Sequence, residues 1–222
     1  MRSKIIALIF LLGICTLDKV EAQTTVTTAV PFILITPDSR AGGMGETGVA
    51  IADNVWATFW NPAGLAFQQG SELAMTHTNW LPGLGLSDIW IAHLAYKQPI
   101  EALDGVVGGQ LTYLNLGEFI RTSSSGPEEI GRFKAFEYAI TAGFATTISD
   151  NFSIGLNLRL IHSSLSPYST EGETGTGIAT SVSGDIGILY KLLLSQANVL
   201  VIFFQFAFDY LVPYLFRFFL LA

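Results

Sequence analysis

Residues 135–164, which read AFEYAITAGFATTISDNFSIGLNLRLIHSS, decide the fold. Apolar residues recur at every second position on both sides of Ser149-Asp150-Asn151, whose residue types favour tight turns. A period of two predicts two β-strands, each with one apolar and one polar face, joined as a hairpin. The apolar faces carry Phe136, Tyr138, Ile140, Ala142 and Phe144 before the turn, and Phe152, Ile154, Leu156, Leu158 and Leu160 after it. The opposite faces carry Glu137, Thr141, Gly143 and Thr147, and then Ser153, Gly155, Asn157 and Arg159.

These predicted strands are longer than those of most soluble sheets. A soluble strand has about 5–6 residues, whereas a tilted strand that crosses a membrane needs about 9–11. Strand-like patterns recur at 71–80, 88–97, 105–117, 134–149, 152–164 and 176–191. The sequence therefore predicts an all-β fold, an antiparallel transmembrane β-barrel of which about six strands are present. A soluble β-sheet is the alternative that alternation by itself leaves open.

The connections between the predicted strands differ in length between the two ends of the barrel. The turn at 149–151 is short, and the connection at 98–104 falls at the same end. Outer-membrane barrels have short periplasmic turns and longer external loops, so this end is predicted to be periplasmic. The external loops, where we expect contact with partners, are then 81–87, 118–133 and 165–175.

Aromatic residues on the apolar faces stand near the predicted strand ends. Trp90 and Tyr96 lie near opposite ends of one strand, and Phe136 and Tyr138 lie toward the predicted outer rim. Aromatic girdles at both membrane interfaces are typical of such barrels.

Composition agrees with an apolar protein that lacks long apolar runs before its last segment. Of the 222 residues, 50% are hydrophobic and 13% are charged, and the mean hydropathy is +0.47. No stretch before residue 192 offers the roughly 20 apolar residues of a spanning helix. The net charge of −7, without a cluster of Lys and Arg, argues against nucleic acid as a partner.

The N-terminus has the features of an export signal. Arg2 and Lys4 precede a short apolar run at 5–14, and Ala22 offers a small residue before a predicted cut at Gln23. Residues 1–22 are therefore predicted to be a signal peptide. Cys15 would leave with it, so the mature chain would have no thiol and no disulfide.

Residues 23–70 form a segment rich in Gly, Pro and Trp that suits a compact plug rather than a strand. Asp53 is predicted to cap a short helix through Trp56 and Phe59. Asn61 is predicted to cap another turn that begins at Pro62. Trp56, Phe59, Trp60 and Phe67 would then anchor the segment against the barrel interior.

Two stretches carry a family resemblance: TAVPFILITPDSRAGGMGETGVA at 28–50 and WNPAGLA at 60–66. They resemble the FadL-like outer-membrane superfamily and, more narrowly, the PorV family of the type IX secretion system of Bacteroidetes. The resemblance implies an N-terminal hatch whose motif residues are Pro31, Pro37, Asp38, Arg40, Gly42, Gly43, Met44, Gly45, Trp60, Asn61, Pro62 and Gly64.

The same resemblance implies a non-enzymatic protein of the cell outer membrane. Its partners would be outer-membrane lipid, proteins of the type IX translocon and of the attachment complex, and secreted cargo with a C-terminal signal. The alternative is a FadL-like transporter of hydrophobic small molecules, which the polar residues on the predicted lumen face disfavour.

Other motifs predict no catalytic residue, cofactor or metal. The glycines at 43–48 match a dinucleotide fingerprint in spacing, but Pro37 separates them from the preceding apolar run and no βαβ pattern follows. His77, His93 and His162 lack a second ligand at metal-binding spacing. Glu137, Arg159 and Asp185 fall on the predicted lumen faces. They are interpreted either as polar residues that face water in the barrel interior or as an ion-pair network that fixes the plug.

Residues 192–222 differ from the rest of the chain because they lack glycine and crowd phenylalanine. Taken literally they form a possible membrane helix, interrupted by Asp209, Pro213 and Arg217. Six strands do not close a barrel, for which about eight is the smallest usual number. We expect instead that a frame slip or truncation replaced the native barrel sequence after about residue 191.

Overall fold

The computed structural model describes residues 30–80, 88–123, 126–168, 176–192, 198–208 and 217–221. By its contacts the chain divides at Phe32, and the second unit is Phe32–Ala222. The sheet and the helices from α2 onward belong to the second unit. The predicted signal peptide with its cut between Ala22 and Gln23 lies outside the described residues.

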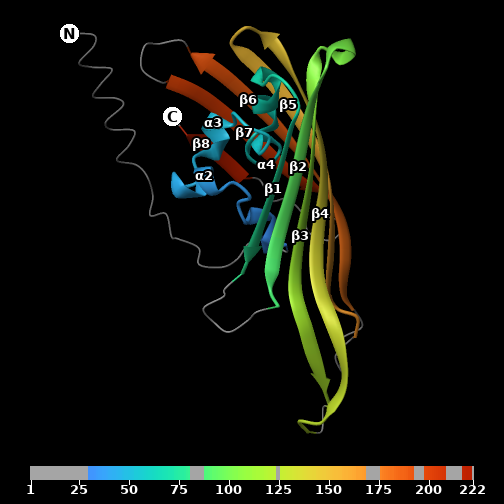
Figure 1. Cartoon of the computed structure of the whole chain (residues 1–222). Helices are drawn as coiled ribbons and strands as arrows, with labels where there is room; N and C mark the ends of the chain where they lie inside the picture. Colours follow the sequence, from blue (N-terminus) through green and yellow to red (C-terminus); the bar gives the residue numbers. More distant parts are fainter. Residues whose placement is uncertain are drawn as a thin grey trace, which may run out of the picture. The chain divides into compact units, whose positions relative to one another are not determined.

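A single antiparallel sheet dominates the second unit, and its strands follow one another in chain order (Figure 1). The strands are β1 (Glu72–Asn79), β2 (Trp90–Ile100), β3 (Gly105–Thr122), β4 (Glu129–Ser149), β5 (Phe152–Ser166), β6 (Gly177–Leu192), β7 (Asn198–Phe208) and β8 (Arg217–Leu221). Within the described residues β1 and β8 each pair on one side only, so the sheet is open. The predicted all-β fold, an incomplete antiparallel barrel, is confirmed.

The two faces of the sheet have the predicted characters. On β5, Leu158 is 68% exposed, whereas its neighbours Asn157 and Arg159 are 3% and 8% exposed. The exposed apolar face is the one expected to meet lipid. The polar face, called the inner face below, is covered by the helices that precede the sheet.

The six predicted strands correspond to β1–β6, with two differences. First, β3 and β4 extend well into the predicted polar loop 118–133, which is therefore mostly a strand hairpin. Second, β7 and β8 lie in the segment 192–222 and continue the sheet. The membrane-helix interpretation of that segment is wrong for the residues that the structure describes there. In the described part of the chain no helix is long and apolar enough to cross a membrane.

The helical segment, residues 32–70, consists of short helices because glycine, proline and capping residues interrupt it. Its elements are η1 (Pro31–Leu34), α2 (Ser39–Gly43), α3 (Gly48–Ile51), α4 (Ala57–Trp60) and η2 (Pro62–Phe67). A further turn, η4 (Glu101–Leu103), connects β2 to β3. As predicted, Asn61 caps η2: its side chain accepts a hydrogen bond from Ala63 N at 3.1 Å.

One predicted cap is wrong. Asp53 does not cap α4, and its carboxylate instead pairs with Arg40 at 2.8 Å. The side chain of Asn54 accepts from Trp56 N at 3.0 Å and takes that place. Asp38 caps α2 by accepting from Arg40 N at 2.9 Å.

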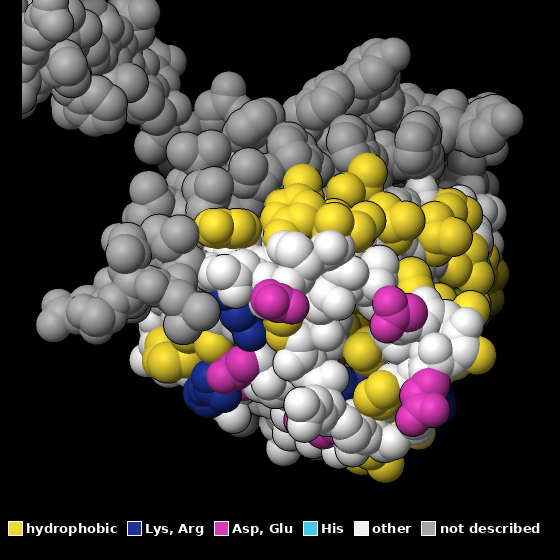
Figure 2. All heavy atoms as spheres, turned by 90° about the horizontal axis from the view of Figure 1, so that it is seen from above, with side chains coloured by type: hydrophobic (Ala, Val, Ile, Leu, Met, Phe, Trp, Pro, Cys, Tyr) yellow, Lys and Arg dark blue, Asp and Glu magenta, His cyan; other side chains and the backbone are white. Residues whose placement is uncertain are grey.

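The tight turns and the helical segment lie toward the same end of the sheet (Figure 1). Figure 2 looks onto this end and shows acidic and basic side chains scattered over it, with hydrophobic side chains most dense toward the upper right of the view. A polar end of this kind suits contact with water.

Candidate functional site: the inner face and the outer hairpin

Apolar side chains of the helical segment pack against the inner face. Val55, Trp56 and Trp60 form a cluster with Ala95 of β2, and Phe59 packs against it. Leu65 of η2 packs with Val106 of β3 and Ala145 of β4. Lys191 of β6 places its ammonium over the ring of Phe67, 4.1 Å from the centroid. The aromatic residues predicted as anchors thus contact the sheet or the cluster that rests on it.

Hydrogen bonds between the strands and the helical segment fix the orientation of the segment on the inner face. Ser153 Oγ donates to Ala63 O at 2.8 Å, and Asn157 Nδ2 donates to Thr58 O at 2.8 Å. Asn61 Nδ2 donates in turn to Ile188 O of β6 at 3.2 Å. Because these groups are buried, displacement of the segment would leave them without partners, which is costly.

A buried ion pair supports the same contact. Arg159 on β5 and Asp185 on β6 lie 2.9 Å apart, with side chains 9% and 0% exposed. Asn157 Nδ2 also donates to Asp185 Oδ2 at 3.2 Å, and Arg159 Nε donates to Thr141 Oγ1 at 3.1 Å. Since Asn157 bonds both Asp185 and the helical segment, the ion pair belongs to a network that reaches the segment. Glu137 does not join it and accepts from Ser163 Oγ at 2.7 Å.

Glycines on the inner face allow the chain from Asn61 to Ala63 to approach the strands closely. A Cβ on Gly155 would overlap the backbone of Pro62 and Ala63, and a Cβ on Gly187 would overlap the Asn61 side chain. Both strands are otherwise regular here, so side-chain volume alone explains the need for glycine.

An aromatic row crosses the exposed face of the strands near the end opposite the tight turns. Neighbouring ring centroids are 5.3 Å apart for His77 and Trp90, 5.4 Å for Trp90 and Tyr113, and 6.0 Å for Tyr113 and Phe136. His162 lies 5.1 Å from Tyr138 and extends the row to β5. Rows of this kind are typical of the membrane interface.

Beyond the aromatic row, β3 and β4 continue as a two-stranded extension, called the outer hairpin (residues 117–122 and 129–135). Strand β2 pairs with β3 only as far as Asn115, and β5 pairs with β4 only from Phe136. Pairing between β3 and β4 nevertheless continues to Thr122 and Glu129. In the described ranges no third strand pairs with this extension, which Figure 1 shows running past its neighbours.

The outer hairpin carries an aromatic patch on one face. Phe119 stacks on Phe133 with centroids 5.7 Å apart, and Phe133 lies 5.9 Å from Tyr168, which follows β5. The guanidinium of Arg121 lies 4.3 Å from the Tyr168 centroid. Phe119 and Tyr168 are 44% and 41% exposed, so the patch presents rings and a cation to solvent.

The opposite face of the outer hairpin carries an ion-pair network. Arg132 lies 2.6 Å from Glu129 and 3.2 Å from Glu118. The hydrogen bond from Arg132, followed by its charge, lowers the pKa of the exposed Glu129 carboxyl. The network holds the two strands together where no neighbouring strand supports them.

Residues 18–196 match a family model, which is described as type IX secretion system protein PorV. The chain belongs to the PorV family. Membership makes the chain an outer-membrane component of the type IX secretion system. Proteins of this family interact with other components of that system, and the family is not a known enzyme family. The match extends just beyond β6, so β7 and β8 lie outside it. No curated protein matches the chain.

Within this PorV-family chain the predicted hatch motif divides into two parts. Trp60, Asn61, Pro62 and Gly64 lie at the inner face, and a Cβ on Gly64 would overlap Ala52. The other part folds on itself: Asp38 accepts from Asn54 Nδ2 at 3.1 Å, and Arg40 pairs with the exposed Asp53, which raises the pKa of Arg40. Pro31 lies in η1, Pro37 lines a cavity, Gly42 and Gly43 lie in α2, Met44 is exposed, and Gly45 has φ +74°.

Sequence reasoning missed the aromatic patch of the outer hairpin. The run of Ser and Thr at 122–125 led to the prediction of a polar loop over the whole of 118–133. A signal was present, because Phe119 and Arg121 alternate with Glu118 and Ile120 in the period of a strand. The sequence predicts no metal and no cofactor. The described residues contain no group of three or more acidic, His or Cys residues that could hold a metal.

Proposed function

We propose that this chain engages secreted cargo bearing a C-terminal signal at the outer hairpin and passes it to the surface attachment machinery. Membership of the PorV family supports the secretion role. The observation that carries the finer proposal is the exposed patch of Phe119, Phe133 and Tyr168 with Arg121 on a hairpin that projects beyond its neighbours. Tyrosine and arginine are enriched among the residues that dominate protein–protein binding energy, and phenylalanine is enriched in interfaces.

The contacts on the inner face favour a fixed hatch over a conduit for small molecules. A FadL-like transporter would need the helical segment to move aside for its ligand. Here buried hydrogen bonds, an ion-pair network and two glycine contacts hold the chain from Thr58 to Ala63 against β5 and β6. We therefore propose that the helical segment acts as a hatch that stays in place, and that cargo is handled at the rim. Export by the predicted signal peptide with a cut after Ala22 remains part of this proposal.

Site-specific photo-crosslinking in the native host tests the proposal. A photoreactive phenylalanine analogue at Phe119 is expected to crosslink to signal-bearing cargo during secretion. The same analogue at Leu158, which is 68% exposed on the apolar face, is the matched control and should label lipid instead. Cargo adducts at both positions, or at neither, would contradict the rim proposal.

Mutation of the patch gives a second readout. Phe119→Ser together with Tyr168→Ser should reduce the surface display of cargo while leaving the level of the barrel in the membrane unchanged. Ile120→Ser, on the opposite face of the same hairpin, is the control. Unchanged display in the double variant would overturn the assignment of the patch to cargo.

A further inference from the structure

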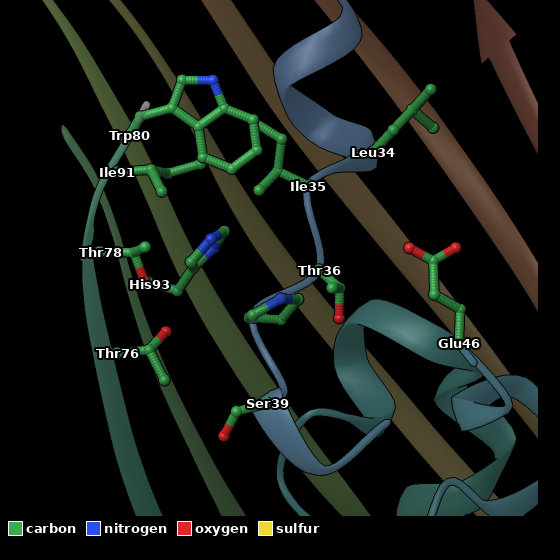
Figure 3. A pocket seen from close by; sticks show the side chains of 11 residues that line it. Leu34, Ile35, Thr36, Ser39, Glu46, Thr76, Thr78, Trp80, Ile91 and His93 are labelled. Atoms are coloured by element: carbon green, nitrogen blue, oxygen red, sulfur yellow. The ribbon is translucent and has the colours of Figure 1, made fainter. Parts of the chain in front are cut away.

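A cavity of about 410 Å³ lies between the start of the helical segment and the first two strands (Figure 3). The chain from Leu34 to Ser39 forms one wall, and residues of β1 and β2 form the other. Pockets for small molecules have volumes of about 300–1,000 Å³, so this cavity is large enough for a small ligand. It is separate from the contact between Asn61 and the strands.

Two buried polar atoms without a partner lie on the strand side of the cavity. Thr76 of β1 and His93 of β2 are directly opposite each other across the strand pair, and both line the cavity. Among the residues that the structure describes, Thr76 Oγ1 and His93 Nε2 have no hydrogen-bond partner. His93 is only 3% exposed, so its ring is held in the wall rather than in solvent. Unpartnered buried polar atoms of this kind favour a ligand that can bond to them.

The neighbouring hydrogen bonds indicate which role His93 Nε2 plays. Its other ring nitrogen, Nδ1, lies 3.1 Å from Thr112 Oγ1. The same hydroxyl oxygen accepts from Gln110 Nε2 at 3.2 Å, and its hydrogen can donate to Nδ1 in the Nε2–H tautomer of His93. A neutral imidazole then carries its hydrogen on Nε2. In that tautomer the cavity offers a ring N–H donor beside a threonine hydroxyl.

The rest of the lining sets the polarity and charge of the occupant. Leu34, Ile35, Trp80 and Ile91 provide apolar surface. Of the described residues that line the cavity, Glu46 is the only charged one. An anionic head would thus meet a carboxylate and no cation, which is unfavourable.

We propose that this cavity binds an uncharged amphiphile of the monoacylglycerol type. An ester carbonyl accepts from His93 Nε2, a hydroxyl bonds Thr76 Oγ1, and the acyl chain packs against the apolar lining. This inference does not depend on the proposed role in secretion, because it concerns a separate part of the inner face.

Equilibrium binding of radiolabelled monodecanoin to the protein purified from outer membranes and reconstituted in nanodiscs tests the proposal. We expect saturable binding of one molecule per chain above that of empty nanodiscs. Thr76→Val and His93→Phe should each weaken binding roughly tenfold, the equivalent of one lost hydrogen bond. Decanoate, which has the same chain and an anionic head, should bind at least about tenfold more weakly.

The matched control is His77→Phe, the same substitution on the exposed face of β1, which should bind like the parent. Heat-modifiable migration on gels checks that each variant is folded, and the near-isosteric Thr76→Val remains informative if His93→Phe does not fold. Absence of saturable binding would mean a cavity filled with water, and would overturn the proposal. Equal binding of decanoate, or unchanged binding in Thr76→Val, would also overturn it.

Discussion

Removal of one partner from the ion pair between Arg159 and Asp185 should destabilise the barrel strongly. The two groups lie 2.9 Å apart with 9% and 0% exposure, so Asp185→Leu leaves the guanidinium buried with Thr141 as its one remaining partner among the described residues. An uncompensated buried charge of this kind costs about 3–5 kcal/mol. Replacement of both partners, in Arg159→Met with Asp185→Leu, removes the charge and should cost only about 1 kcal/mol, mainly for the lost bond of Asn157.

Urea unfolding of the protein in lipid vesicles, followed by tryptophan fluorescence, measures these free energies. Arg132→Leu is the control: its ion pairs are about half-exposed, so its loss should cost much less than the loss of a buried partner. If Asp185→Leu alone cost less than Arg132→Leu, the network would not support the barrel. If the destabilisation of the double variant equalled the sum of the destabilisations of Arg159→Met and Asp185→Leu, an unpaired buried charge would not explain the loss of stability.

Three further changes test neighbouring parts of the structure. Gly187→Ala should cost about 1–3 kcal/mol in the same unfolding assay, because its Cβ would overlap the Asn61 side chain. The control is Gly184→Ala, whose Cβ would have its nearest atom 3.5 Å away and which should be nearly neutral. Equal costs for the two variants would contradict the close contact. Asn61→Ala removes a helix cap and a bond to β6 and should cost about 2 kcal/mol, and a neutral result would refute its role. The pKa of Glu129 is lower in the folded hairpin, so the support from Arg132 is present above the ordinary pKa of 4.5 and is lost as pH falls through the lower folded value. Hydrogen exchange of the hairpin amides should therefore rise in that pH range in the parent protein. The Glu129→Gln variant should show no such rise.

The strands were predictable because their signal is local. Alternation over 135–164 identified β4 and β5, and it assigned Asn157 and Arg159 to the inner face without any knowledge of the sheet. Strand β7, NVLVIFFQFAF, escaped prediction because its residues are apolar at nearly every position, which hides a period of two.

The contacts of the helical segment were not predictable in the same way. Ser153 bonds Ala63 across a separation of 90 residues, and nothing in either local pattern specifies that register. Arg159 and Asp185 were expected on one face, but their pairing depends on the register between β5 and β6, which the intervening loop sequence does not determine. The glycines at 155 and 187 are explained only by the backbone that lies over them.

A covalent link between the helical segment and the strands tests the central claim most directly. The buried side chains of Ala63 and Leu189 of β6 pack in one cluster, so Ala63→Cys with Leu189→Cys places two thiols at that contact. Formation of the disulfide is followed by gel mobility, and secretion of signal-bearing cargo is measured with and without reductant. We predict normal secretion in the linked protein, because the proposal keeps the hatch in place and assigns cargo handling to the outer hairpin. Loss of secretion on linking, with recovery on reduction, would show that the segment must move and would contradict the account.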